Sequence, residues 1–220
     1  MLLLAFDTAT PAVTVALHDG DRVIAEAVTV DARRHGELLS PSIAKVIADA
    51  GVTRHDITAV AVGAGPGPYT SLRAGVVTAR VLGAALALPV YGVCTLDVIA
   101  RGALAGGVGR AFLVATDARR KEVYWARYSG SGDRLSGPAV GKPADVRADG
   151  LPGPVAGEGG FLYPAELGEP IQPRYPDAGM LAHIAAERVR GGTPMLAPEP
   201  LYLRRPDARV PGPPKRVTPS

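Results

Sequence analysis

The residues best placed to do chemistry lie in a loop of glycines and prolines at positions 63–75. Gly65 and Gly67 can take a positive φ or let another backbone come close, while the neighbouring prolines stiffen the loop. The loop follows an apolar run and precedes a helical pattern whose first free N–H groups Thr70 or Ser71 could cap. A capped helix behind a glycine loop is a common site for a phosphate group.

The loop lacks the residues that make a phosphate site specific. A Walker-type loop needs a lysine beside the serine or threonine after its last glycine, and a dinucleotide-binding GxGxxG needs a third glycine where Thr70 stands. We therefore prefer a tight structural connection between a strand and a helix, with a phosphate site as the alternative.

Other side chains that could bind a metal or act as nucleophiles are scattered along the chain. Asp7, followed by Thr8, could hold a magnesium ion or water near a phosphate, although an aspartate before a threonine-rich turn also often caps that turn. Cys94 is the only cysteine and ends an apolar run, which is typical of a buried structural thiol. No HxxxH or HExxH spacing occurs among the four histidines, His18, His35, His55 and His183.

The composition is that of a globular protein with a sizeable core. The 220 residues are 47% hydrophobic and can form one large or two small domains. The longest uncharged stretch is shorter than the ~20 residues of a spanning helix, and the apolar start meets Asp7 too early for a signal peptide, so we expect a cytoplasmic protein without a membrane partner. Residues 204–220 carry five basic residues against one aspartate and many prolines, which predicts a disordered basic tail.

Hydrophobic periodicity predicts a first lobe over residues 1–104, with a mixed sheet flanked by helices. Its elements follow in the order strand, strand, strand, helix, strand, helix, strand, at residues 1–6, 13–17, 22–30, 35–50, 59–62, 70–88 and 90–93. Pro41 lies inside the first helical pattern, so the helix begins either after a Ser40 cap or near His35 with a kink. We favour the start near His35.

The second predicted helix carries a small residue at every fourth position, namely Gly75, Ala79, Gly83 and Ala87. Such a row lets another backbone pack closely against the helix. The sequence leaves open whether this chain's own sheet or first helix, or another protein chain, fills that space.

Residues 110–203 are expected to form a smaller second lobe after a glycine-rich hinge at 102–109. Asp117 ends its first strand in a setting that echoes Asp7, which indicates a duplicated architecture. Residues 129–176 hold few apolar runs and predict little. The other expected elements are a hairpin, a helix and a short strand-like piece, at residues 111–128, 180–189 and 201–203.

Several segments in a fixed order resemble the TsaB (YeaZ) family. They read LAFDTAT, RRH, GPGPYTSLRAG, GVCTL, DARRKEVY and PLYLR, at residues 4–10, 33–35, 65–75, 92–96, 117–124 and 200–204. The resemblance covers residues 1–204 and departs from the family pattern at Ser71, where glycine is usual. It implies an α/β fold like that of actin, hexokinase and other sugar-kinase-like ATPases, in two lobes with mixed sheets, of which the second is reduced.

The resemblance also implies a function, which is to support the complex that installs threonylcarbamoyl on the tRNA adenosine beside the anticodon. The catalytic subunit of that complex, TsaD, carries a metal-binding HxxxH whose positions fall on Thr95 and Ile99 here. We therefore expect no catalytic, metal or cofactor site on this chain, and ATP and metal in the TsaD partner. A vestigial nucleotide loop would consist of Asp7, Thr8, Gly65, Gly67 and Thr70.

The partners implied are a TsaD-like subunit in a heterodimer, a TsaE-like ATPase, tRNA through the complex, and a second copy of this chain when it is alone. The family pairs through helices of the first lobe, which assigns residues 35–50 and 70–88 to the interface. The predicted interface residues are His35, Leu39, Ser42, Val46, Arg73, Gly75, Val76, Ala79, Arg80 and Gly83. Two alternatives stay open: a nucleotide-dependent phosphotransferase or ATPase, and, less favoured, a metallopeptidase.

Overall fold

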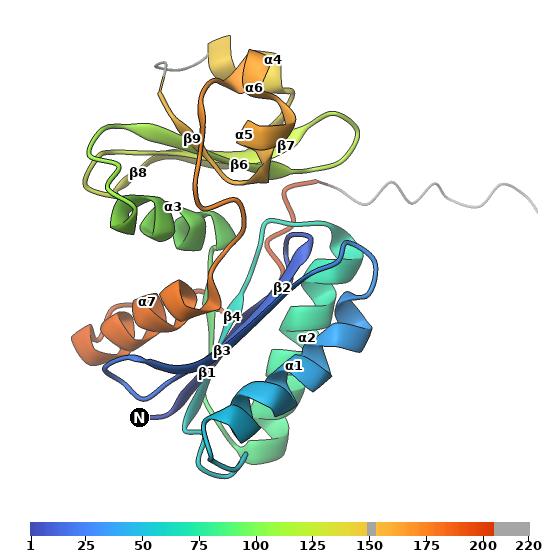
Figure 1. The fold of residues 1–220 in the computed structure, drawn as a ribbon, viewed down its shortest axis with the longest axis vertical. Coiled ribbons are helices and arrows are strands. Elements are labelled where there is room, and N and C mark those ends of the chain that lie inside the picture. Colours follow the sequence, from blue (N-terminus) through green and yellow to red (C-terminus); the bar gives the residue numbers. More distant parts are fainter. Residues whose placement is uncertain (149–152, 205–220) are drawn as a thin grey trace, which may run out of the picture.

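The computed structural model describes residues 1–148 and 153–204, which form two lobes that are each built on a five-stranded mixed sheet (Figure 1). The strand order is β3-β2-β1-β4-β5 in the first lobe and β8-β7-β6-β9-β10 in the second. In both sheets the first three strands form an antiparallel meander and the last two run parallel to the first. The shared topology confirms the duplicated architecture and the actin-like fold.

The first sheet contains β1 (Leu3–Asp7), β2 (Ala12–His18), β3 (Val23–Val30), β4 (Ala59–Gly63) and β5 (Val90–Val93). The second contains β6 (Phe112–Asp117), β7 (Val123–Tyr128), β8 (Arg134–Gly141), β9 (Val155–Ala156) and β10 (Pro170–Ile171). The helices are α1 (His35–Asp49), α2 (Tyr69–Leu86), α3 (Thr95–Ala105), α4 (Pro143–Ala148), α5 (Glu158–Leu162), α6 (Pro164–Leu167) and α7 (Ala178–Gly191). The seven elements predicted for the first lobe are confirmed, including the start of α1 at His35 with Pro41 inside the helix.

Both faces of the first sheet are covered, by α1 and α2 on one side and by α7 on the other (Figure 1). Successive residues of β1 alternate between the two cores: Leu4 and Phe6 belong to the core under α1 and α2, and Leu3 and Ala5 to the core under α7. Burial on both faces explains why β1 and β4 are almost continuously apolar.

Two helices cross the boundary that the sequence predicted between the lobes. α3 runs through part of the expected hinge at 102–109, and its Ile99 lies in one buried cluster with Phe112 and Tyr128 of the second sheet. α7, expected in the second lobe, packs Leu181 into the core of the first sheet. The sequence predicted no helix at Thr95–Ala105. For α7, periodicity identifies the apolar face of the helix but not the sheet that covers it.

The C-terminal part of the described chain passes between the lobes without forming the strand expected at 201–203 (Figure 1). The Leu201 N–H donates to the Ala64 carbonyl at 2.8 Å, which ties this segment to the first lobe. Arg204, predicted to begin the tail, donates to the Ala118 carbonyl at 3.2 Å and pairs with Glu122 in the second lobe. The rest of the predicted tail lies outside the described residues.

The row of small residues on α2 packs against this chain's own sheet. The Gly75 N–H donates to the Thr8 hydroxyl oxygen at 3.0 Å, and a Cβ at Gly75 would lie 2.6 Å from that oxygen. A Cβ at Gly83 would lie 2.2 Å from a methyl carbon of Val90, and Ala79 is buried. Gly75 and Gly83 are small because the end of β1 and β5 come close to α2, so of the two alternatives that the sequence left open, this chain's own sheet fills the space at these positions. Ala87 is exposed at the C-terminal end of the helix.

Replacing Gly75 with valine is expected to lower the free energy of unfolding by about 1–3 kcal/mol, because overpacking must displace the hydrogen-bonded Thr8 or the helix. Urea denaturation followed by circular dichroism measures this loss. Ala84→Val, on the exposed side of the same helix, is the matched control and should change the free energy by less than about 0.5 kcal/mol. Equal losses for the two variants would show that α2 does not approach β1 this closely.

Candidate functional site

The end of β1, the glycine loop after β4 and the start of α3 meet at a buried group that we call the Asp7 cluster: Asp7, Gly65 and Thr95. The Thr95 hydroxyl donates to Asp7 Oδ2 at 2.7 Å and accepts from the Gly65 N–H at 3.2 Å. The Thr95 N–H donates in turn to the Gly65 carbonyl at 2.8 Å. The structure thus brings Asp7 and Gly65 together, as predicted, but through Thr95.

Burial governs the acid–base properties of this region. Desolvation raises the pKa of Asp7, although the hydrogen bonds from Thr95 and the Ala9 N–H and the charge of His35 act in the opposite direction. Burial also raises the pKa of the nearby Cys94 thiol to about 11, so this thiol stays protonated at neutral pH. Cys94 is buried, as predicted for a structural thiol.

The glycine loop fits a phosphate group poorly, because two of its residues are prolines and the Gly65 N–H is already bonded within the chain. Gly65 takes a φ of +89° and gives its N–H to Thr95. Gly67 is packed against the β1–β2 turn, where an added Cβ would lie 2.4 Å from the Ala9 carbonyl oxygen. The prolines at 66 and 68 have no N–H to offer. The preferred interpretation of the loop as a tight structural connection is consistent with these contacts.

The predicted cap of α2 is wrong. The helix begins at Tyr69, one residue before Thr70, and no side chain caps it. The Ser71 hydroxyl donates to the Pro68 carbonyl at 3.1 Å instead of accepting a free N–H. Thr8 donates to the Ser71 carbonyl at 2.6 Å, which ties the first turn of α2 to the end of β1.

Among residues 1–148 and 153–204, no group of three or more histidine, cysteine, aspartate or glutamate side chains is placed to hold a metal ion. Thr95 and Ile99, the positions that correspond to the HxxxH of TsaD, are both fully buried. The ring of His35 lies 2.7 Å from the Thr10 carbonyl oxygen and so joins the start of α1 to the β1–β2 turn. Within the same part of the chain, no helix is long and apolar enough to cross a membrane.

Most of the predicted interface residues lie inside the first lobe. Arg73 and Arg80 are exposed and Ser42 is half-buried. The buried ones are His35, Leu39, Val46, Gly75, Val76, Ala79 and Gly83. The exposed face of α2 instead carries Val77 and Val81, which are 54% and 59% exposed. The sequence contained their signal, since both are large apolar residues on the side of the helix opposite the small row.

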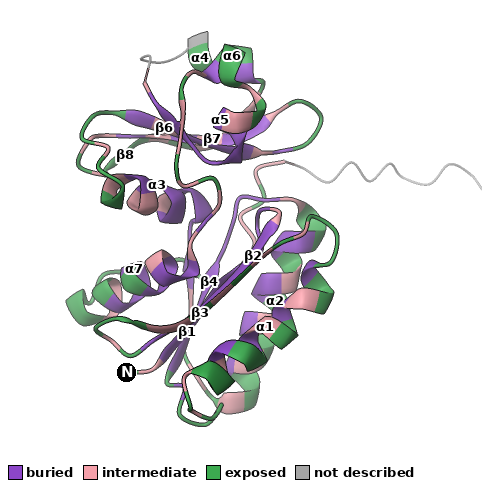
Figure 2. Cartoon of the chain, in the orientation of Figure 1, coloured by how far each residue is buried: buried purple, intermediate pink, exposed green. Residues whose placement is uncertain are grey.

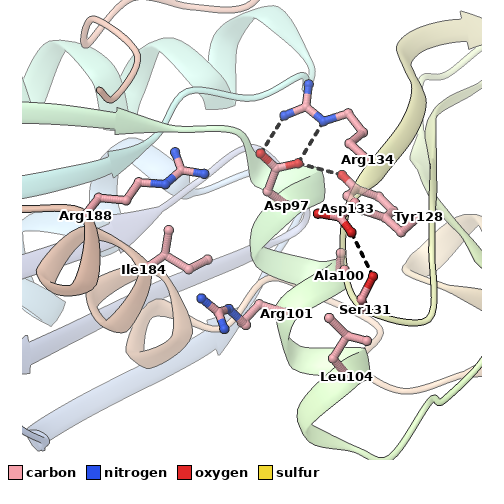
Figure 3. Close-up of a pocket in the computed structure, with 11 residues that line it drawn as sticks. Asp97, Ala100, Arg101, Leu104, Tyr128, Ser131, Asp133, Arg134, Ile184 and Arg188 are labelled. Carbon is pink, nitrogen blue, oxygen red and sulfur yellow. Dashed lines mark hydrogen bonds and ion pairs between the residues drawn. The ribbon is translucent and has the colours of Figure 1, made fainter. Parts of the chain in front are cut away.

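A separate polar pocket of about 570 Å³ lies between α3, α7 and the β7–β8 turn (Figure 3). Asp97 accepts from Arg134 Nε at 3.0 Å and from the Tyr128 hydroxyl at 2.7 Å. Burial and Asp97 both raise the pKa of Tyr128, while the ion pair with Asp97 raises the pKa of Arg134 against the effect of burial. Because Arg101 also pairs with Glu187 of α7, these charges join α3 to both lobes.

The raised pKa of Asp7 gives a pH-dependent contribution to stability. The folded chain holds this proton more tightly than the unfolded chain, so the contribution of Asp7 is lost as pH rises above its ordinary pKa of 3.8. Asp7→Asn removes this loss, so the unfolding free energy of the variant relative to wild type is expected to increase from pH 4 to pH 7.

Urea denaturation at the two pH values measures the change. Asp56→Asn is the control, because hydrogen bonds from Thr53 lower the pKa of this exposed carboxylate. For Asp56→Asn the unfolding free energy relative to wild type should therefore decrease from pH 4 to pH 7. A difference between Asp7→Asn and wild type that does not change with pH would contradict the prediction.

Comparison with known proteins gives the family. The family model described as TsaD, tRNA N6-adenosine threonylcarbamoyltransferase, matches residues 22–164. A protein of Mycobacterium tuberculosis is 49% identical over 215 residues, which are 94% of this chain and 93% of that protein. The tRNA threonylcarbamoyladenosine biosynthesis protein TsaB of Escherichia coli is 39% identical over 128 residues, 58% of this chain and 55% of TsaB.

Solved structures agree with these sequence relatives. YeaZ from Pseudomonas aeruginosa matches with a TM-score of 0.77 and 29% identity, over 92% of this chain and 99% of YeaZ. A second Pseudomonas aeruginosa structure, described as similar to peptidase YeaZ, matches with a TM-score of 0.79 at the same identity and coverage. Sequence relatives, solved structures and the motifs around the Asp7 cluster agree that the chain belongs to the TsaB (YeaZ) family.

Proposed function

We propose that this chain is a non-catalytic subunit in tRNA threonylcarbamoyladenosine biosynthesis and that it pairs with a TsaD-like catalytic subunit through the outer faces of α1 and α2. The relatives in Escherichia coli and Bacillus subtilis are both named tRNA threonylcarbamoyladenosine biosynthesis protein TsaB, and the proposed pathway is taken from that name. The observation that carries the docking proposal is the pair of exposed valines on α2, Val77 and Val81.

The docking face has the character of a protein interface. Val77 and Val81 lie one turn apart on the exposed side of α2, and the exposed Arg73 and Arg80 lie near them on the same helix. α1 lies beside α2 and exposes small apolar side chains such as Ala44. Figure 2 shows the outer faces of both helices as largely exposed. An apolar centre edged by arginines is typical of a surface that another protein covers.

The Asp7 cluster supports the non-catalytic part of the proposal. Asp7 is fully buried and hydrogen-bonded inside the protein, and the Gly65 N–H of the loop donates to Thr95. A phosphotransferase would need those groups free, and a metallopeptidase would need a metal-binding pair where Thr95 and Ile99 are buried. The ATP and metal chemistry is therefore proposed to reside in the TsaD-like partner, with a TsaE-like ATPase and the tRNA joining the assembled complex.

The docking proposal predicts that Val81→Glu weakens binding to the TsaD-like protein of the same organism by at least about tenfold, because it places a charge at the centre of an apolar contact. Val28→Glu is the matched control, since Val28 on β3 is also 59% exposed but alternates with Ala27, which packs on the core under α1 and α2, and so faces the other side of the sheet. Co-purification and titration calorimetry measure binding, and circular dichroism confirms that both variants are folded. Wild-type binding by Val81→Glu, or equal losses for both variants, would contradict docking through α2.

A further inference from the structure

The mouth of the cleft between the lobes contains a cavity of about 550 Å³ that neither the Asp7 cluster nor the docking face explains. Tyrosines and arginines from both lobes line it, among them Tyr69, Tyr124, Tyr202, Arg119 and Arg204. Aromatic rings combined with guanidinium groups are the usual means by which proteins bind a nucleobase and a phosphate together.

Two of these tyrosines form a fixed stacking surface. Tyr69 and Tyr202 stack with ring centroids 5.2 Å apart and an interplanar angle of 21°. They nevertheless remain 49% and 41% exposed. Arg73 holds the pair in place: its guanidinium lies 4.1 Å from the centre of the Tyr69 ring, and its Nε donates to the Tyr202 hydroxyl at 2.8 Å. The pair therefore presents aromatic surface to solvent at little entropic cost on binding.

The opposite side of the cleft carries an unusual basic turn between β6 and β7. Arg119, Arg120 and Lys121 have φ values of 60°, 56° and 59°, a left-handed conformation that residues with a Cβ rarely adopt, least of all three in succession. All three are exposed. Backbone strain of this kind tends to be retained where a turn serves binding.

Basic groups outnumber acidic groups around the cavity. Asp117 pairs with Arg119 at 3.2 Å and Glu122 pairs with Arg204, so each carboxylate is balanced by one guanidinium. Further positive charge at this surface comes from Lys121, which is exposed, and from Arg73.

We infer that this surface, formed by the Tyr69–Tyr202 pair and the 119–121 turn, binds single-stranded RNA, with a base stacked on the tyrosines and backbone phosphates on the basic turn. The chemistry of this surface would suit a free nucleotide as well, because a nucleotide offers the same base and phosphate. The choice of RNA therefore rests on the proposed function in tRNA modification. Binding of this kind tolerates many sequences and weakens as salt rises.

The test is fluorescence anisotropy of the full chain with a labelled, mixed-sequence RNA of about 12 nucleotides, which falls within the range that single-strand-binding modules cover. Tyr202→Ala and the double variant Arg119→Glu/Lys121→Glu are expected to weaken binding at least fivefold. Arg22→Glu/Arg54→Glu, which changes the net charge equally at exposed sites elsewhere, should stay within twofold of wild type. Tyr202→Phe keeps the ring but loses the hydrogen bond to Arg73, so it should weaken binding less than Tyr202→Ala does.

Several outcomes would overturn the inference: equal losses for the two double variants, no loss for Tyr202→Ala, or displacement of the RNA by AMP at an equal concentration of nucleotide. The last result would assign the surface to a free nucleotide. Failure of this inference is distinguishable from failure of the docking proposal, because Val81→Glu should leave RNA binding unchanged while it weakens binding to the TsaD-like partner.

Discussion

A carboxylate with no access to solvent stabilises a protein only if its oxygens are hydrogen-bonded, and Asp7 imposes that condition on the whole first lobe. Thr95 and the Ala9 N–H meet it, which fixes where α3 begins relative to β1. Gly63 at the end of β4 must be glycine, because a Cβ there would lie 1.8 Å from an Asp7 oxygen. The glycine at position 63 is therefore a consequence of the buried acid.

The same constraint turns the glycine loop inward. With its Gly65 N–H bonded to Thr95 and Gly67 packed on the β1–β2 turn, the loop connects a strand to a helix. The chain keeps the two-lobed arrangement of its fold. Two exposed surfaces are not explained by packing within the described residues. These are the exposed valines of α2 and the aromatic, basic mouth of the cleft, to which we assign a protein partner and RNA respectively.

The sequence predicted the first lobe well because its signals are local. The alternation in β2, the helical spacing from Leu39 to Val46 and the apolar run before Gly63 each identify an element without reference to the rest of the chain. In the second lobe, β9 and β10 have two residues each and α6 has four, which is too short for any periodic pattern.

Contacts between distant segments were harder to predict. The small row on α2 correctly indicated a close neighbour, but only the structure identifies it as β1 and β5. Tyr69 and Tyr202 are 133 positions apart in the sequence, and no pattern shows that they stack. The Asp7 cluster could be predicted only in part from the sequence. Asp7 and Gly65 were named from their motifs, whereas Thr95 was noted only because it stands where TsaD has a metal-binding histidine.

The central claim is that this chain supports tRNA modification by association and not through a reactive site of its own. The most direct measurement is the rate of threonylcarbamoyladenosine formation by a complex reconstituted with the TsaD-like subunit of the same organism, together with the affinity of that subunit for each variant. Folded Thr95→Val, which removes the hydroxyl from the Asp7 cluster, should keep both rate and affinity within about twofold, whereas Val77→Glu should lose both together. A Thr95→Val complex that assembles normally but has lost its rate would contradict the claim.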